Sequence, residues 1–344
     1  MSISDYIEAR RREVEDALGR ILPEPPDCPA VVHDAMRYSL LAGGKRLRPV
    51  LCLASADAVG GDRASALPAA CAIELIHTYS LIHDDLPAMD NDTMRRGRAT
   101  LHVVAGEGQA ILAGDGLLTE AFNVVARSPR PRDYERALTQ LDVIRMIASA
   151  AGAVGMVGGQ AIDLLYSGLG TRPGPPKPPS SESGGSGREE PSLLRPSTLL
   201  GAALSEVEGR EARPTPPLDA DGLRRMHAKK TGALIRVAAA AGAMMGGGTA
   251  AQVEAIDEAA GEFGLAFQIV DDVLDVEGAS ADLGKTAGKD AAAGKVTYPS
   301  IYGLEQSKRM ATACLERAEE ALRRAALQDS HLMAIGRWIV ERKN

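Results

Sequence analysis

Apolar residues recur at intervals of three and four positions along most of this chain, and short runs containing Gly or Pro separate the periodic stretches. This period is typical of amphipathic helices that bury one face. We therefore expect an all-α fold. The pattern predicts helices at residues 3–20, 30–42, 47–59, 64–84, 101–126, 134–158, 219–246, 250–275, 298–303, 307–326 and 331–342.

Composition supports this fold class. Phe, Trp and Tyr together make up only 3% of the 344 residues, whereas 45% are hydrophobic. A core of Ala, Leu, Val and Ile favours helices, because Ala leads the helix-propensity scale and strands prefer β-branched and aromatic residues. All-β folds are disfavoured, and a chain of this length can bury a substantial core without covalent or metal cross-links.

One segment departs from the helical pattern. Between Ser167 and Ser197, 20 of 31 residues are Pro, Gly or Ser, a composition that buries too little apolar area to offset the entropy of ordering. We expect a single domain spanning 1–344, interrupted by a disordered or loosely ordered insertion at about 166–217. We interpret the insertion as a solvated loop, with a partner-binding or regulatory segment as the alternative.

The net charge of −7 argues against a nucleic-acid partner, since such proteins carry basic stripes. Four scattered cysteines without metal-ligand spacing indicate neither a disulfide framework nor a zinc site. The charged, amphipathic N-terminus does not resemble a secretory signal, and the uncharged stretches 146–162 and 237–251 are too rich in Ala and Gly to span a bilayer. We expect a cytoplasmic protein without stable membrane insertion.

The first cluster with candidate chemistry follows an apolar helix. That helix leads directly into Asp84 and Asp85, and Asp90 follows after a proline. Three carboxylates at a helix C-terminus are opposed by the helix dipole and by their mutual repulsion. A bound cation would relieve both effects, and oxygen ligands without His or Cys indicate Mg²⁺ or Mn²⁺. The alternative for this cluster alone is a solvated charged turn.

A second acidic cluster lies near the C-terminus. Gln268, Asp271, Asp272 and Asp275 fall at relative positions 0, 3, 4 and 7, which places them on one helical face. Apolar residues cover the rest of the circumference, as is typical of a buried helix. We therefore expect the acidic face to line an internal cavity, where metals or cations offset the cost of burying carboxylates. An exposed acidic face is the alternative.

Basic residues are sparse and gather in a few short motifs. Each alone is most simply a surface charge, but together with two oxygen-only clusters they indicate a ligand with much negative charge, such as a diphosphate bridged to Asp through Mg²⁺. No P-loop or nucleophile-elbow motif is present, and the G-x-G at Gly106 lacks the strand context of a dinucleotide site. The basic residues concerned are Lys45, Arg46, Arg48, Arg95, Arg96, Lys229, Lys230, Lys285, Lys289 and Lys295.

Taken together, the motifs resemble those of the trans (E)-prenyl diphosphate synthases, in particular the bacterial-type farnesyl and geranylgeranyl diphosphate synthase family. The resemblance covers the chain apart from the insertion. It implies an isoprenoid synthase-type helical bundle around a central cavity, and a homodimer. The motifs, in family order, are GGKRLRP, DDLPAMD followed by RRG, GGQAID, KTGALI, FQIVDDVLD, LGKTAGKD and GKVTYP.

The resemblance also implies roles for individual residues. Three Mg²⁺ ions per site, or Mn²⁺, would lie between the two clusters when diphosphate is bound, with Asp84, Asp90 and Asp271 as direct ligands and Asp85, Asp272 and Asp275 completing the metal set. The allylic diphosphate would be bound by Arg95, Lys230 and Lys285, with Gln268 and Thr231 orienting it. Isopentenyl diphosphate would be bound by Lys45, Arg48, His77 and Arg96. Supporting residues would be Gln160, Asp163 and Lys295.

In such an enzyme the allylic diphosphate ionises, isopentenyl diphosphate attacks the carbocation, and proton loss to the released diphosphate completes a 1'-4 condensation. The growing chain would run beside the first-cluster helix, so the side chains four and five residues before Asp84 would form its floor. Those are Ser80 and Tyr79, and a Tyr at this depth predicts mainly farnesyl diphosphate.

Several alternatives stay open on the sequence. Within the family, the product could be geranylgeranyl diphosphate. A terpene cyclase or a squalene/phytoene-type synthase shares the fold, but would not need the second diphosphate pocket. From another class, the chain could be a non-catalytic subunit that modulates a synthase, although such a subunit would be expected to lose one aspartate cluster.

Overall fold

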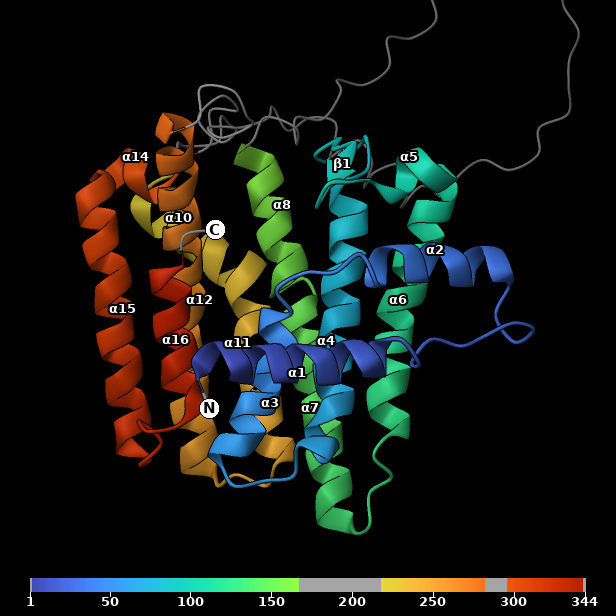
Figure 1. Cartoon of the computed structure of the whole chain (residues 1–344), viewed down its shortest axis with the longest axis horizontal. Coiled ribbons are helices and arrows are strands. Elements are labelled where there is room, and N and C mark those ends of the chain that lie inside the picture. The colour runs from blue at the N-terminus through green and yellow to red at the C-terminus, as the bar shows by residue number, and fades with distance from the viewer. Residues whose placement is uncertain (1, 167–217, 282–295, 343–344) are drawn as a thin grey trace, which may run out of the picture.

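The structure is a computed structural model that describes residues 2–166, 218–281 (side chains to 278) and 296–342. The predicted all-α fold is confirmed for these residues (Figure 1). The helices are α1 (Ile3–Leu18), α2 (Ala30–Leu40), α3 (Leu47–Ala58), α4 (Arg63–Asp84), α5 (Leu101–Ala105), α6 (Glu107–Arg127), α7 (Tyr134–Ala151), α8 (Met156–Tyr166), α10 (Ala220–His227), the π-helical turn η1 (Ala228–Gly232), α11 (Ala233–Met245), α12 (Ala250–Ala281), α14 (Tyr298–Tyr302), α15 (Leu304–Arg324) and α16 (His331–Glu341).

Glycines divide two stretches that the sequence predicted as continuous helices. The predicted helix 101–126 is two helices, because Gly106 adopts φ 84°, a left-handed conformation that ends α5 and begins α6. The predicted helix 134–158 is interrupted between α7 and α8, where Gly152 and Gly155 lie. The predicted helix 219–246 contains the π-helical turn η1, which carries two lysines. The predicted insertion lies outside the described residues, apart from Tyr166 at the end of α8.

The described residues contain one small sheet, which the sequence did not predict. Strand β1 (Met94–Arg95) pairs antiparallel with β2 (Arg98–Ala99). The turn between them places Arg96 at φ 52° and Gly97 at φ 75°, the pair of positive angles that closes a tight hairpin. This hairpin lies beside the end of α4 that carries the first aspartate cluster (Figure 1).

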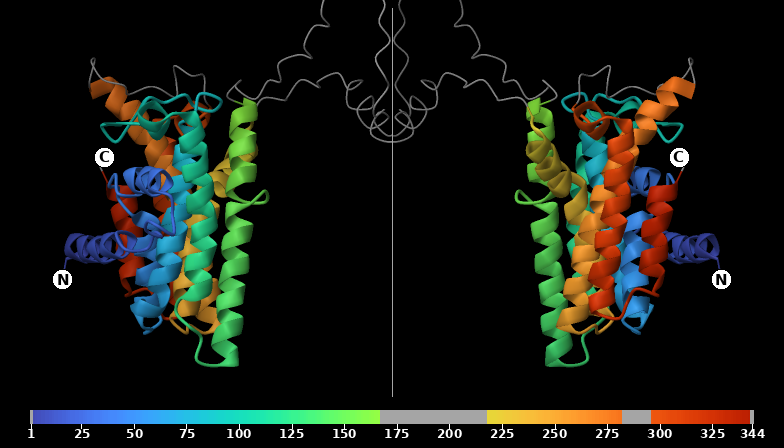
Figure 2. Two further views of the ribbon diagram at one scale, coloured as in Figure 1. Left: turned by 90° about the vertical axis from the view of Figure 1, so that its right-hand side faces the viewer. Right: turned by 90° about the vertical axis from the view of Figure 1, so that its left-hand side faces the viewer.

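The core lies where α3, α4 and α11 pack together. Small residues allow the close approach: a Cβ on Gly242 of α11 would lie only 1.9 Å from the backbone oxygen of Cys52 on α3. The buried face of α11 is largely alanine, which explains how a core with few aromatics fills its volume. Helices α4, α6, α12 and α15 run roughly along one direction, and α1 and α2 cross them (Figures 1 and 2).

Two stretches within the described ranges are long and apolar enough to cross a membrane by length and composition: α4, and Tyr134–Tyr166, which comprises α7 and α8. The prediction that 146–162 is too weakly apolar was therefore wrong on composition. The tested window of α4 is 67% buried in the bundle. The burial of α4, and the break between α7 and α8, mean that neither stretch by itself indicates a membrane span.

Candidate active site

A cavity of about 370 Å³ lies between the C-terminal half of α4, helix α8 and the turn η1. It combines a polar wall with an apolar one, which suits a ligand that has a charged head and a hydrocarbon tail. The polar wall consists of Arg48, His77, Asp84, Gln160, Lys230 and Thr231. The remainder of the lining is Tyr79, Ser80, Leu81, His83, Met89, Met156, Val157, Ala161 and Leu164.

Asp84 ends α4 at the polar side of this cavity. Burial, with a smaller contribution from the negative charges of Asp90 and Asp85, raises the pKa of its carboxyl from the ordinary 3.8 to about 6, against the opposing effect of Lys230 and Arg95. A carboxylate in this position is stabilised by a cation. The local charge therefore fits the predicted metal site.

Asp85, the second residue of the first cluster, is held by the hairpin. Arg95 Nη2 lies 2.7 Å from Asp85 Oδ1, and Arg95 Nε donates to both carboxylate oxygens at 2.8 and 3.0 Å. Burial raises the pKa of Asp85, and the bond to Arg95 opposes that shift. This bidentate contact fixes the hairpin against the end of α4 and neutralises the charge of Asp85, one of the two adjacent aspartates.

Helix α8 and the turn η1 bring Lys230 to the cavity. Lys230 Nζ lies 2.5 Å from Asp163 Oδ2. The backbones of α8 and η1 approach closely at Gly159: a Cβ at this position would lie 2.2 Å from the backbone nitrogen of Lys230. Next to this contact, the amide of Gln160 is buried, and neither its oxygen nor its nitrogen has a hydrogen-bond partner within the described part of the chain. An unpartnered buried amide in a cavity is suited to binding a polar ligand.

The aspartates of the second cluster, predicted from the sequence to line one internal cavity, differ in exposure and in partners within the described residues. Asp272 is buried and accepts a hydrogen bond of 2.9 Å from the backbone nitrogen of Tyr298 at the start of α14. The Asp271 side chain is 46% exposed and lies 2.5 Å from the guanidinium of Arg342. Burial raises the pKa of Asp271, and Arg342 opposes this shift. The split arises because neighbouring helix ends meet this face of α12 and engage each aspartate differently.

The described residues contain no group of three His, Cys, Asp or Glu side chains close enough to hold a metal. Mg²⁺ commonly binds to one or two carboxylates and completes its shell with water and substrate phosphates. The cluster around Asp84 fits that mode, in which a diphosphate contributes ligands. The metal roles of Asp84, Asp85, Asp90, Asp271 and Asp275 stay predictions, as does that of Asp272, whose carboxylate accepts a hydrogen bond from the α14 backbone.

The predicted isopentenyl diphosphate residues gather around the loop before α3. Arg48 makes no hydrogen bond or ion pair within the described ranges, and its Nε is buried. Burial lowers the pKa of Arg48, and burial together with Arg48 and Arg96 lowers that of His77 well below its usual range, so His77 is neutral at pH 7. Arg96 donates to the backbone oxygen of Gly43, and Lys45 is exposed. The cationic side chains make this region electropositive and suited to an anion.

Tyr79 and Ser80 both line the cavity, as the floor prediction requires, although the structure does not test their effect on product length. Tyr79 is only 7% exposed, and its ring meets that of His83 edge-on, with 5.6 Å between centroids. The sequence did not lead us to predict that Met156 and Leu164 line the cavity. Their spacing of eight residues on one helical face is a signal that could have found them. Lys285 and Lys295 lie outside the described residues.

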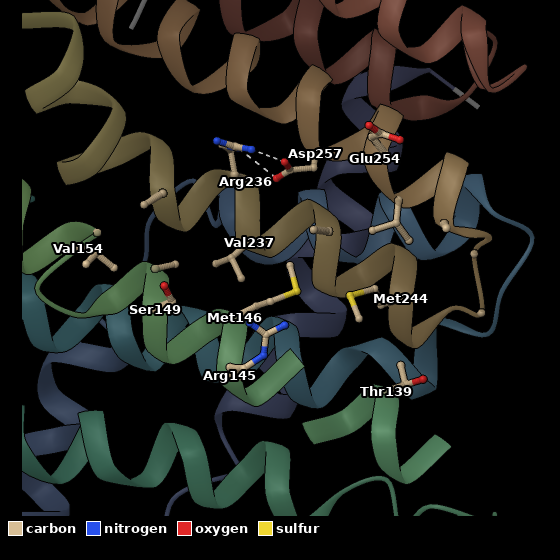
Figure 3. Close-up of a pocket in the computed structure, with 18 residues that line it drawn as sticks. Thr139, Arg145, Met146, Ser149, Val154, Arg236, Val237, Met244, Glu254 and Asp257 are labelled. Atoms are coloured by element: carbon tan, nitrogen blue, oxygen red, sulfur yellow. Dashed lines mark hydrogen bonds and ion pairs between the residues drawn. The ribbon is translucent and has the colours of Figure 1, made fainter. Parts of the chain in front are cut away.

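A second cavity, of about 780 Å³, lies between α7, α11 and the start of α12 (Figure 3). Its centre is apolar, with Met146, Val237 and Met244, and the ion pair between Arg236 and Asp257 lies at its edge. None of the predicted site residues lines it. The larger cavity is therefore separate from the residues that carry the predicted chemistry.

Comparisons with known proteins agree with the fold and the cavity. The family model described as polyprenyl synthetase matches residues 29–172 and 200–330, and its gap falls within the predicted insertion. The chain is 40% identical over 344 residues to a farnesyl diphosphate synthase of Geobacillus stearothermophilus, covering 99% of this chain and 98% of that protein. It is 39% identical over 344 residues to a geranylgeranyl diphosphate synthase of Cyanophora paradoxa, covering 98% and 96% respectively.

Solved structures give the same result. The crystal structure of an FPP/GFPP synthase from Zymomonas mobilis superposes with a TM-score of 0.74 at 32% identity, covering 98% of each chain. The all-helical fold with its cavity at the aspartate-bearing end of α4 is thus that of a prenyltransferase. The chain belongs to the polyprenyl synthetase family.

Proposed function

We propose that this prenyltransferase is a Mg²⁺-dependent farnesyl diphosphate synthase, which condenses isopentenyl diphosphate with dimethylallyl or geranyl diphosphate. The observation that carries this proposal is the cavity, in which Asp84 and Lys230 line the polar wall and Tyr79 lies among apolar side chains. A diphosphate head and an isoprenoid tail match these two kinds of wall.

Asp84 and Asp90 would hold Mg²⁺ on the allylic diphosphate, with Asp271 from α12 completing the binding of the ions. When bound, the metal stabilises the negative charge that develops on the departing diphosphate. Lys230 and Arg95 would add cationic contacts to the same oxygens, and Thr231 and Gln268 would orient them. Groups that are held in place before the substrate binds stabilise developing charge most effectively, and ion pairs already hold Arg95 and Lys230.

Isopentenyl diphosphate would bind on the other side, at Lys45, Arg48, His77 and Arg96. Arg48 carries this assignment best, because it is a cation without a hydrogen-bond or ion-pair partner in the described part of the chain. A neutral His77 can donate one hydrogen bond to a diphosphate without competing for the proton released during condensation. That proton would leave with the diphosphate product.

Product length is the finer part of the proposal. The two relatives named above are a farnesyl and a geranylgeranyl synthase, and both are near 40% identical to this chain. Tyr79 favours the fifteen-carbon product, because its ring occupies the cavity beside α4 where a longer chain would extend. Geranylgeranyl diphosphate synthesis is the alternative, and a non-catalytic regulatory subunit is the alternative from a different class.

We further propose that the enzyme is a cytoplasmic homodimer that joins through α6, α7 and α8. Helices α7 and α8 lie at one edge of the bundle with α6 beside them (Figure 2), and the three helices expose large apolar side chains that a monomer would leave in water. A second copy of the same surface would cover them in an isologous interface. The exposed side chains are Ile111, Leu112, Leu138, Leu141 and Val157 on these helices, with Val154 in the connection between α7 and α8.

The decisive experiment incubates purified protein with Mg²⁺, isopentenyl diphosphate and either dimethylallyl or geranyl diphosphate, and identifies the products by chromatography and mass. Farnesyl diphosphate, lost in Asp84→Ala and Asp271→Ala, supports the proposal. A longer product would keep the condensation but overturn the farnesyl assignment. A folded protein that forms no product would favour the non-catalytic subunit. Light scattering of the same sample measures the oligomeric state.

A further inference from the structure

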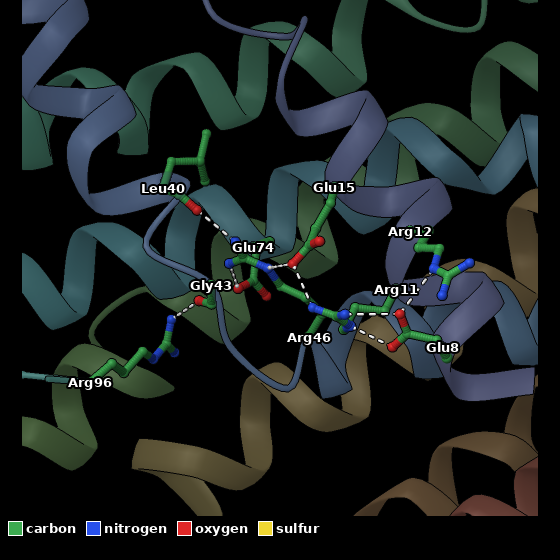
Figure 4. Close-up of polar contacts among 9 residues, drawn as sticks. All are labelled: Glu8, Arg11, Arg12, Glu15, Leu40, Gly43, Arg46, Glu74 and Arg96. Atoms are coloured by element: carbon green, nitrogen blue, oxygen red, sulfur yellow. Dashed lines mark hydrogen bonds and ion pairs between the residues drawn. The ribbon is translucent and has the colours of Figure 1, made fainter. Parts of the chain in front are cut away.

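Arg46 is the one arginine of the GGKRLRP loop whose side chain turns away from the cavity. Its Nη1 lies 2.6 Å from Oε1 of Glu74 on α4, and its Nη2 donates to the backbone oxygen of Leu40 at 2.6 Å (Figure 4). The Arg46 side chain is 1% exposed and that of Glu74 is 3% exposed. Arg46 therefore connects the GGKRLRP loop to the core through two buried polar contacts.

A buried ion pair does not necessarily make a protein more stable. Desolvation of both charges can cancel their attraction, so apolar residues often serve stability equally well. Removing one partner alone is far worse, because the other charge is then buried without compensation. The pair between Arg46 and Glu74 thus calls for a role other than general stability.

The loop backbone supplies that role. Arg46 adopts φ 50° and ψ 33°, a left-handed conformation that non-glycine residues rarely occupy, and Gly43 and Gly44 have φ 79° and 139°. Such a turn persists only when surrounding contacts hold it. The hairpin supplies a second contact, since Arg96 donates to the backbone oxygen of Gly43, and a Cβ on Gly44 would lie 2.7 Å from Arg96 Nη1.

Glu74 also lies at the centre of a cluster of arginines. Its charge raises the pKa of Arg48 and that of Arg96, both of which burial lowers. His77 follows three residues later on α4, so Glu74 lies on the same helical face, about one turn from that predicted isopentenyl diphosphate residue. One buried anion therefore offsets several cations that must stay close together before a diphosphate arrives.

We propose that Arg46 and Glu74 are positioning residues, which hold the turn at 43–46 so that Lys45 and Arg48 face the diphosphate of isopentenyl diphosphate. This inference rests on the proposed function, because it assumes that Lys45 and Arg48 bind that substrate. Neither Arg46 nor Glu74 lines the cavity of the candidate active site. Their contribution is to keep two cations in a fixed geometry, so that binding does not first have to order them.

The contacts of Arg46 beyond Glu74 provide a matched control. Glu15 Oε1 on α1 lies 3.8 Å from Arg46 Nε and 3.1 Å from Nη1 of Arg11, which itself contacts Glu8 (Figure 4). These outer charges are partly exposed, and ion pairs of that kind contribute little. Arg11→Gln therefore disturbs the outer contacts while leaving the buried pair in place.

The test measures steady-state kinetics with each substrate varied in turn, for Glu74→Gln, Arg46→Lys and the control Arg11→Gln. We expect KM for isopentenyl diphosphate to rise about 10- to 100-fold in the first two variants, with a much smaller change in kcat and in KM for geranyl diphosphate. Arg11→Gln should match the original protein. Circular dichroism and a thermal melt establish that each variant is folded.

A double variant, Arg46→Met with Glu74→Leu, separates positioning from stability. It replaces the buried pair by apolar side chains, so its melting temperature should return toward that of the original protein while KM for isopentenyl diphosphate stays high. Recovery of both values, or equal losses for both substrates, would overturn the proposal. If Glu74→Gln does not fold, the double variant and Arg46→Lys decide the question. Absence of condensation in the unaltered protein would instead reject the proposed function.

Discussion

Arg342, at the end of α16, covers the face of α12 that carries Asp271. Its guanidinium carbon lies 3.9 Å from the centre of the Phe267 ring, and a guanidinium nitrogen lies 2.5 Å from Asp271 Oδ1. The arginine side chain is only 4% exposed. A carboxylate proposed to bind Mg²⁺ is thus paired with a cation from the chain's own C-terminal region, and metal binding would have to displace it.

Arg342→Gln should lower the Mg²⁺ concentration that gives half-maximal activity, by about two- to fivefold, since it removes the cation that competes with the metal for the partly exposed Asp271. The measurement is a Mg²⁺ titration of the condensation rate at saturating substrates. Arg337→Gln is the control, because Arg337 lies on the same helix and pairs with Glu319 at 3.8 Å. A higher Mg²⁺ requirement in Arg342→Gln would contradict the competition.

Asp84→Asn should abolish condensation yet stabilise the metal-free protein at pH 8. Folding raises the pKa of Asp84 from 3.8 to about 6, so the folded state binds the proton more tightly and loses relative stability as pH rises between these values. Above pH 6 the penalty is complete, at about 1–3 kcal/mol, and below pH 4 it vanishes.

Thermal melts without metal, at pH 4 and pH 8, test whether the charged carboxylate of Asp84 destabilises the folded protein. The melting temperature of Asp84→Asn should exceed that of the unaltered protein at pH 8 and match it at pH 4. Asp34→Asn changes an exposed aspartate on α2 and is expected to show no such difference. A destabilised Asp84→Asn at pH 8 would mean that partners other than a metal satisfy this carboxylate.

Tyr79→Ala should shift the product toward twenty carbons, because the ring removed from α4 leaves room in the cavity for a longer chain. Truncating a buried aromatic also costs about 3–5 kcal/mol, so the assay should be run well below the melting temperature. Products are identified by mass. Tyr302→Ala removes a Tyr that is 41% exposed, and its product should be unchanged. An identical product profile for Tyr79→Ala would reject the floor assignment.

Lys230→Gln should reduce kcat/KM for the allylic substrate by about 10²–10³, the cost of losing one cationic group aimed at developing negative charge. Its neighbour provides the control. Lys229 donates to the backbone oxygen of Val154 at 2.6 Å and does not line the cavity. If Lys229→Gln and Lys230→Gln lose activity equally, the damage would come from the turn η1 as a whole rather than from the charge of Lys230.

Gly159→Ala should lower both stability and activity, because its new Cβ would meet the backbone of Lys230 at 2.2 Å and force α8 and η1 apart. Gly108→Ala on α6 introduces the same methyl group where no atom lies within 4 Å. That control should be neutral or slightly stabilising, since Ala is the better helix former. Equal melting temperatures for the two variants would show that α8 can shift without cost.

The sequence by itself determined the helical class and the family, since both follow from local patterns. Helical periodicity predicted the elements, and the motif around Asp84 indicated the chemistry before any contact was known. The same local reasoning missed the break at Gly106 and the hairpin at Arg96. Both depend on positive φ angles, which the spacing of apolar residues does not reveal.

Only the tertiary structure decided which charges are free. GGKRLRP presents two arginines with the same local signal, yet Arg46 is buried against Glu74 while Arg48 stays unpartnered within the described residues. Asp271 and Asp272 are likewise adjacent, but one is partly exposed beside Arg342 and the other binds the backbone of α14. The reason is physical: electrostatic partners come from distant helices, and desolvation depends on what packs around a group rather than on its neighbours in sequence.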